Sequence, residues 1–317
     1  MKKRNSDKIV GMLGCMAERL KDKVLEHKVV DLVAGPDAYR DIPRLLKILK
    51  NKESEEQPMN VQLSFDETYA DIIPVRKDKS NQHAWVSIMR GCNNMCSFCI
   101  VPFTRGRERS RPVSSIEDEI KYLRDEGIRE VTLLGQNVNS YHDKQMQTRW
   151  STDGLHVNSS GFNEMYKLRD GNGVRFAELM DRVSDIAPEV RFRFTSPHPK
   201  DFPDDLLHVI ANKANVCKQI HLPAQSGNTE MLFRMRRNHT RESYIELVHH
   251  IRDLIPGVAL SSDFICGFCD ETEAEFEDTI SLLEEVKYDM AFLFAYSMRE
   301  RTHAHRRMQD NVDEKVK

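Results

Sequence analysis

Three of the seven cysteines in this 317-residue chain fall within eight residues, as Cys92, Cys96 and Cys99. Their spacing is C-x3-C-x2-C, and residues 84–89 before them read as a short buried strand. Three thiolates can hold three irons of a cubane iron–sulfur cluster, because each iron takes one soft protein ligand. The fourth iron would then be open to a small molecule, as in a catalytic metal site. The loop therefore predicts a cluster with one free iron at a strand end.

Two other interpretations of this loop stay open. Zinc is the first, but structural zinc takes four ligands, and no histidine or fourth cysteine follows at a zinc-site spacing. The second is three unrelated cysteines, which their close spacing after a strand disfavours. An odd number of cysteines with three clustered also argues against a secreted disulfide framework and for a reducing compartment.

The overall charge and the N-terminal residues limit the classes of function that this chain can have. A formal charge of −3 gives no basic footprint, so any contact with nucleic acid must be local. No apolar run is long enough to span a membrane, and no membrane partner is expected. The first eight residues lack the apolar core of a signal peptide, and no Arg/Ser-rich amphipathic stretch follows. The chain is thus expected to carry no recognisable targeting segment, which leaves a cytoplasmic location open.

From Trp85 onward, six strand patterns alternate with helical patterns. Such alternation predicts right-handed βαβ units and a parallel sheet. We therefore expect an α/β fold, a partial (β/α)6 TIM-like barrel over residues 84–305, in preference to an open doubly wound sheet. In a barrel, residues that follow the strands share one mouth. The expected strands cover residues 84–89, 131–134, 190–195, 217–222, 258–265 and 290–296.

The chain before the barrel reads as part of a second, smaller domain. Residues 8–50 give strand, helix, strand and helix, so residues 1–50 are expected to be the C-terminal part of a small α/β domain. Two strands can hardly bury their own faces, so more chain should precede them or they should dock elsewhere. Residues 51–83 are expected to be a linker, and residues 306–317 the start of a further region.

Two local features are predicted inside the barrel region. Ser114 and Glu117 have the spacing of a capping box before a helical apolar stripe, and Thr240 is expected to cap a later helix. Residues 141–175 form a polar insertion without periodicity, which is too long for an ordinary βα connection. A surface loop or a lid that contacts the substrate would both fit this insertion.

The cysteine loop, with Phe98 before the third cysteine, resembles the radical S-adenosylmethionine (SAM) superfamily. Longer segments narrow the resemblance to the MiaB-type tRNA methylthiotransferases, namely residues 86–112, 134–140, 195–199 and 221–227. Residues 36–41 and 292–299 resemble the animal mitochondrial branch of that family, which is named for association with a regulatory subunit of cyclin-dependent kinase 5.

The resemblance implies a transferase with two cofactors. Cys92, Cys96 and Cys99 would bind a 4Fe–4S cluster, whose free iron chelates the amino and carboxylate groups of SAM. One electron from a donor would cleave SAM to methionine and a 5′-deoxyadenosyl radical. The radical would act on C2 of an N6-isopentenyladenosine next to the tRNA anticodon, which then receives a methylthio group. The implied partners are tRNA, the electron donor and a kinase regulatory subunit, and the implied location is mitochondrial.

The resemblance also assigns further site residues. Phe98 would contact the adenine of SAM, through packing or its backbone. Five residues after strand ends would face SAM, and their alternative role is to cap helices or satisfy loops. These five are Gln136, Thr195, Ser196, Gln225 and Gly267.

Alternate arginines follow the cysteine loop, as Arg105, Arg107, Arg109 and Arg111. In an extended segment alternate side chains share one face, so four guanidinium groups could point toward tRNA phosphates. The alternative is a solvated loop whose arginines pair with Glu108 and the nearby acidic helix. A contact with the SAM carboxylate or a structural role for one arginine is also open.

The sequence departs from the family pattern in several places. In the family, three cysteines bind an auxiliary 4Fe–4S cluster, and Cys15 matches the third of them. The first two cysteines have no counterpart in this sequence. The C-terminal TRAM domain of the family has none either. Asp270 stands where a glycine is usual, and Cys266 and Cys269 have C-x-x-C spacing at a position where we expect no metal. We expect an intact SAM-cleaving core in an incomplete methylthiotransferase. The alternatives are another radical SAM enzyme that modifies RNA, or a non-catalytic short form that binds a regulatory partner.

Overall fold

The computed structural model describes residues 8–26, 29–51, 56–64, 78, 80–150, 162 and 172–317. The chain divides into two compact units. The first unit comprises residues 1–68, 91–94 and 100–109, and the second unit comprises residues 69–90, 95–99 and 110–317. None of the helices in the described ranges is both long and apolar enough to cross a membrane.

The first unit is built on a small parallel sheet of three strands, in the order β1-β2-β3. Its buried side chains include Ala17, Val24 and Val33, so the helices cover an apolar face of this sheet. The strands are β1 (Gly11–Leu13), β2 (Leu32–Ala34) and β3 (Met59–Asn60). The helices are α1 (Cys15–Leu20), α2 (Asp22–Glu26), the 3-10 turn η2 (Tyr39–Asp41), α3 (Ile42–Lys50) and α4 (Val101–Arg105).

The third strand corrects the sequence prediction for this region. Residues 51–83 were expected to be a linker and the sheet to have two strands, yet β3 lies within that range and pairs with β2 through Val33 and Met59. A strand of two residues is too short to give an alternating pattern, which explains the miss. Residues 52–55, 65–77 and 79 of the expected linker lie outside the described residues.

The second unit confirms the predicted α/β fold with six parallel strands in chain order. Strands β4, β7 and β10 pair in sequence, as do β11, β12 and β13, and a parallel bridge between Phe192 and Val216 joins the two sets. The order begins at β4 and ends at β13, so the sheet is an open, partial barrel. The strands are β4 (His83–Ser87), β7 (Glu130–Leu134), β10 (Arg191–Phe194), β11 (Gln219–His221), β12 (Ala259–Cys266) and β13 (Met290–Ala295).

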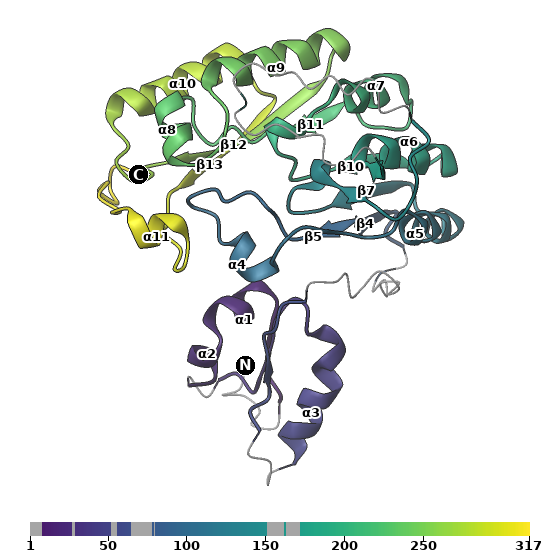
Figure 1. The fold of residues 1–317 in the computed structure, drawn as a ribbon, viewed down its shortest axis with the longest axis vertical. Coiled ribbons are helices and arrows are strands. Elements are labelled where there is room, and N and C mark those ends of the chain that lie inside the picture. The colour runs from purple at the N-terminus through teal and green to yellow at the C-terminus, as the bar shows by residue number, and fades with distance from the viewer. Residues whose placement is uncertain are drawn as a thin grey trace. The chain divides into compact units, whose positions relative to one another are not determined.

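Helices connect successive strands of this sheet, as right-handed βαβ units require (Figure 1). The connecting helices are α5 (Val113–Asp125), α6 (Phe176–Ile186), α7 (Asp204–Asn212), α8 (Thr229–Arg234), α9 (Arg241–Leu254) and α10 (Glu273–Val286). The shorter elements are β5 (Met89–Arg90), β6 (Arg109–Ser110), η3 (Val138–Ser140), β8 (His142–Asp143), β9 (Val174–Arg175), η4 (Pro199–Asp201) and α11 (His303–Arg307).

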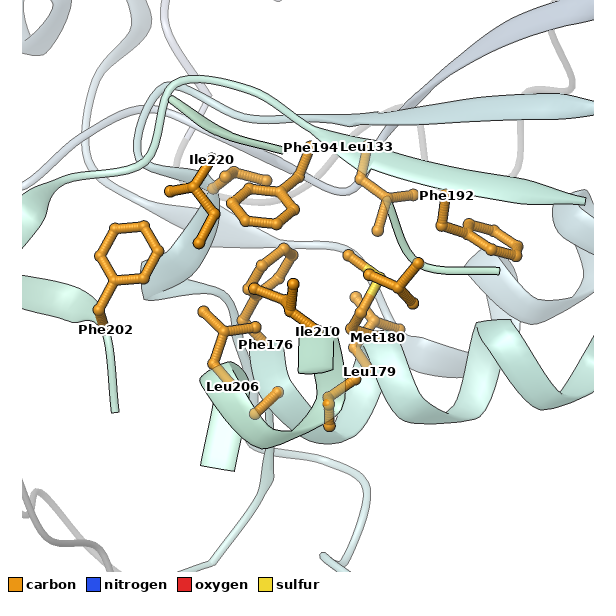
Figure 2. Packing of buried hydrophobic residues seen from close by; sticks show 14 of the residues in the cluster. Leu133, Phe176, Leu179, Met180, Phe192, Phe194, Phe202, Leu206, Ile210 and Ile220 are labelled. Carbon is orange, nitrogen blue, oxygen red and sulfur yellow. The ribbon is translucent and has the colours of Figure 1, made fainter. Parts of the chain in front are cut away.

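The main core lies between the strands and the helices that connect them, and Figure 2 shows the part of it at α6 and α7. Phe192 on β10 is fully buried, and Phe194 meets Phe176 of α6 edge to face, with ring centroids 5.3 Å apart. Each such side chain stabilises the fold by about 1.5–3 kcal/mol relative to exposure. Other side chains in this part of the core are Leu133, Ile220, Leu179, Met180, Leu206 and Ile210.

A side-chain cap explains where α9 begins, and a tertiary contact explains where α5 begins. Thr240 caps α9 with a capping box to Ser243, as predicted. The predicted capping box of Ser114 and Glu117 is wrong, because α5 begins one residue earlier at Val113 and Pro112 has no side chain that can cap. The amide of Val113 instead donates to Asp143 Oδ2 at 2.8 Å, from a strand distant in the sequence.

The two ends of the insertion at 141–175 form an antiparallel pair, β8 with β9. Residues 151–161 and 163–171 lie outside the described residues. The choice between a surface loop and a lid therefore stays a prediction.

Gly227, in the loop after β11, lies close to the backbone of α10. A Cβ at this position would lie 2.4 Å from the carbonyl oxygen of Asp278 and 2.7 Å from the Cα of Thr279. Because both obstacles are backbone, Gly227→Ala is expected to lower the free energy of unfolding by about 1–3 kcal/mol in urea titrations.

Gly257→Ala is the matched control, since its φ is +74° but nothing lies within 4 Å of the added Cβ. It should cost only the left-handed strain of about 1–2 kcal/mol. A Gly227→Ala variant with wild-type stability would show that α10 moves away freely.

Candidate functional site

The carboxyl ends of the six parallel strands lie at one edge of the sheet, which is where such folds bind ligands. The structure brings the five predicted SAM-facing residues to this edge. Gln136 follows β7, Thr195 and Ser196 follow β10, Gln225 follows β11 and Gly267 follows β12. None of the five is the N-cap of a helix in the described part of the chain. The alternative that they cap the N-termini of helices is therefore disfavoured.

Two of these residues have left-handed backbone conformations, which residues other than glycine usually avoid. Ser196 has a φ of +59° and Gln225 a φ of +75°. Left-handed conformations cost a non-glycine residue about 1–2 kcal/mol and concentrate at functional sites. Hydrogen bonds hold Gln225 in place, because its amide donates to Asp263 O at 2.8 Å and its carbonyl accepts from Ile265 N at 3.0 Å. This strain supports a ligand-facing role for the β10 and β11 ends.

Ser97 anchors the part of the cysteine loop that belongs to the second unit. Its amide donates to Met235 O at 2.9 Å and its hydroxyl to Arg234 O at 2.7 Å, at the end of α8. Its carbonyl accepts from Ala304 N of α11 at 2.9 Å. The serine is fully buried, so these three bonds replace water and fix the loop.

Phe98 adds an apolar anchor to the same loop. Its ring meets Phe268 at a centroid distance of 6.4 Å and nearly perpendicular, against a cluster that includes Met231, Met235 and Tyr296. Because the ring is engaged in this packing, the backbone of Phe98 is the group that is available for the predicted adenine contact.

The described cysteines are not joined in disulfides. Cys96 is buried, Cys99 is half-buried, and the amide of Cys99 donates to Cys96 O at 3.0 Å. Cys92 belongs to the first unit, where it is buried and its amide donates to Gly106 O at 3.2 Å. Within the described ranges no three His, Cys, Asp or Glu side chains form a group that could hold a metal ion. The ligand set of three cysteines therefore stays a prediction, and its donor chemistry suits a cluster.

Sequence reasoning missed Arg237, whose Nη1 lies 3.6 Å from Cys96 Sγ. The side chain is buried in the loop between α8 and α9. No spacing rule links an arginine to a cysteine that lies 141 residues away, so only the folded chain reveals this contact.

Cys15, the predicted auxiliary-cluster ligand, begins α1 in the first unit. The Nε of Arg105 lies 2.8 Å from its sulfur. Arg105 therefore contacts a sulfur atom instead of extending toward solvent.

The prediction that four arginines share one extended face is wrong. Arg105 is the last residue of the helix α4, so the segment is not extended throughout. Arg109 is buried and its Nη1 lies 2.9 Å from Asp37 Oδ2 within the first unit. Arg111 is buried in the second unit, with its Nη1 2.7 Å from Glu119 Oε2. Arg107 is exposed, and contact between Arg107 and RNA stays a prediction.

The C-x-x-C pair lies at and beyond the end of β12. Burial raises the pKa of the Cys266 and Cys269 thiols, and nearby Glu271 adds to the effect at Cys266. A raised pKa disfavours the thiolate that metals and redox partners require. Asp270 beside them has a φ of +60°, which explains why a glycine would suit this position.

Comparisons with known proteins agree with this architecture. Residues 86–283 match the model of the radical SAM superfamily. The chain is 60% identical over 309 residues to the mitochondrial tRNA methylthiotransferase CDK5RAP1 of Rattus norvegicus, covering 97% of this chain and 52% of that protein. It is 52% identical over 318 residues to the tRNA-2-methylthio-N(6)-dimethylallyladenosine synthase of Chloroherpeton thalassium, covering 100% of this chain and 64% of that protein. The chain thus spans about half the length of the first of these relatives.

A solved structure shares the fold at low sequence identity. The radical SAM methyltransferase TsrM from Kitasatospora setae aligns with a TM-score of 0.64 and 13% identity. The alignment covers 94% of this chain and 59% of that one. At this identity the likeness shows the fold alone.

Proposed function

Because the chain belongs to the radical SAM superfamily, we propose that it is the SAM-cleaving core of a tRNA methylthiotransferase. The whole protein would place a methylthio group on C2 of an N6-isopentenyladenosine next to the anticodon. The observation that carries the proposal is the C-x3-C-x2-C loop in a chain 60% identical to a protein named as a tRNA methylthiotransferase.

We propose Cys92, Cys96 and Cys99 as ligands of a 4Fe–4S cluster that binds SAM. When bound, the two cofactors supply radical chemistry at an unactivated C–H bond. The chemistry of the donor set fits this group, because all three residues are cysteines and two of them are buried. A cluster iron takes such soft ligands in preference to oxygen.

The protein's own residues would orient SAM and exclude water. Gln136, Thr195, Ser196, Gln225 and Gly267 follow four adjacent strands, so they surround one end of the sheet. We assign them to SAM, with the backbone of Phe98 facing the adenine. The hydrogen bonds of Ser97 and the packing of Phe98 hold the cysteine loop, and Cys96 is only 8% exposed. A fixed and poorly hydrated site protects a reactive intermediate from side reactions.

The proposed reaction requires tRNA and an electron donor for the cluster. Arg107 is our candidate for phosphate contact, since it is exposed. Relatives from Rattus norvegicus, Mus musculus and Homo sapiens are named mitochondrial, and we propose the same compartment. An interaction with a kinase regulatory subunit rests on the family resemblance alone.

Mass spectrometry of tRNA nucleosides tests this function. Disruption of the gene should remove 2-methylthio-N6-isopentenyladenosine and increase N6-isopentenyladenosine. The full-length gene with Cys217→Ala should restore the modification, because Cys217 lies before β11, at the opposite edge of the sheet. The same gene with Cys96→Ala should not restore it.

The alternatives make different predictions for the same experiment. Retention of the methylthio group in the disrupted strain would contradict the proposal. Loss of a different RNA modification would favour another radical SAM reaction, and full rescue by Cys96→Ala would favour a non-catalytic role.

A further inference from the structure

Arg237 is a buried cation without a carboxylate partner in the described part of the second unit. Arg237 is 5% exposed, and it forms no salt bridge with another described residue. Its acceptors are Pro223 O, 2.8 Å from Nη2, and Cys96 Sγ, 3.6 Å from Nη1, while its Nε has no hydrogen-bond partner among the described residues. A buried charge is costly unless an anion or hydrogen bonds compensate it.

The imidazoles near Arg237 cannot supply that negative charge. His239 Nδ1 lies 2.9 Å from Arg237 O, and because a carbonyl only accepts, this nitrogen carries the proton. Burial, with Arg237 as a second cause, lowers the pKa of His239 to about 3. The same two causes hold the pKa of His198 well below its usual value. Both rings are therefore neutral at pH 7.

Sulfur is the remaining candidate for a negative charge beside Arg237. A guanidinium stays protonated in proteins, and its N–H groups are strong donors in fixed directions. A cysteine that binds iron does so as a thiolate, which makes its sulfur a charge-assisted acceptor. The distance of 3.6 Å suits a hydrogen bond to sulfur.

We propose that Arg237 is a positioning residue that donates to Cys96 Sγ and acts as the counter-ion of this thiolate in the cluster. The inference rests on the proposed function, since it requires the cluster. Hydrogen bonds and positive charge near the sulfurs of a cluster favour the reduced state, because reduction adds negative charge. Arg237 would thus raise the reduction potential and ease the electron transfer that precedes SAM cleavage.

The second contact of Arg237 fixes the direction of the guanidinium. Pro223 follows β11, two residues before the strained Gln225. One side chain therefore joins the cysteine loop to the strand end that is predicted to face SAM. A lysine could carry the charge but could not reproduce both directed N–H bonds.

EPR-monitored redox titration of the anaerobically reconstituted chain tests the inference. Arg237→Gln should move the midpoint potential of the cluster to a more negative value, and Arg237→Lys should give a smaller shift in the same direction. Arg236→Gln is the matched control, because Arg236 is the exposed neighbour and solvent screens its charge. It should leave the midpoint unchanged.

The outcomes separate this inference from the proposed function. A wild-type chain that takes up no 4Fe–4S cluster contradicts the proposed function itself. A wild-type cluster whose midpoint is the same in Arg237→Gln overturns the inference alone. If Arg237→Gln loses its native circular dichroism spectrum, Arg237→Lys decides: a midpoint below that of Arg236→Gln supports the inference, and an equal midpoint overturns it.

Discussion

Replacing Cys96 by alanine is expected to reduce SAM cleavage to the uncatalysed background, and Cys92→Ala and Cys99→Ala should do the same. The reason is that each cysteine is the sole proposed protein ligand of one iron, so its loss leaves two irons without protein ligands. The measurement is 5′-deoxyadenosine formed by the reduced, reconstituted chain, quantified by mass spectrometry. Background here means the amount formed with reductant and SAM but without protein.

Cys217→Ala provides the control for a general effect of losing a thiol. Cys217 is a half-buried free cysteine, and burial raises the pKa of its thiol, which makes it a poor ligand. This variant should retain the wild-type rate. If Cys96→Ala cleaved SAM at the wild-type rate, the cysteine loop would have no role in SAM cleavage.

Arg111→Met is expected to lower the free energy of unfolding by about 3–5 kcal/mol, because it leaves the carboxylate of Glu119 buried and unpaired. The arginine also donates to Ser87 O at 2.7 Å and to Ser115 Oγ at 2.8 Å, so it joins the end of β4 to α5. Urea titration measures the change. The double variant Arg111→Met with Glu119→Leu should recover much of it, since no charge then remains buried.

Arg107→Met is the comparison that separates stability from RNA binding. Arg107 is exposed, so its loss should change the stability by less than about 0.5 kcal/mol. It should weaken tRNA binding and reduce the dependence of affinity on salt. If Arg111→Met instead left stability intact and weakened binding as Arg107→Met does, the predicted row of phosphate-facing arginines would be reinstated.

The parallel sheet could be predicted because its signals are long and repeat. Strand β12 spans eight residues, Ala259–Cys266, and α9 and α10 each span fourteen residues with clear apolar faces. The prediction placed each strand within a few residues of its observed position. The short elements β3, α4, α8 and α11 were missed, since a pattern needs several residues to establish a period.

The general position of the site could also be predicted, because in a parallel sheet the residues after the strands share one edge. The roles of individual charged residues could not. Alternate spacing suggested that Arg109 and Arg111 face outward, yet Asp37 and Glu119 bind them, and Asp37 lies 72 residues away in the sequence. The contact of Arg237 with Cys96 is equally non-local. Such pairs depend on the folded arrangement, which no local pattern encodes.

The central claim is that three cysteines hold a cluster with one iron left open for SAM. EPR spectroscopy of the reduced, reconstituted chain, with and without added SAM, tests it most directly. We expect about four irons per chain, from one cubane cluster, and a spectrum that changes when SAM is added, because SAM binds the open iron. A spectrum that is the same with and without SAM, or a chain that takes up no cluster, would contradict the account.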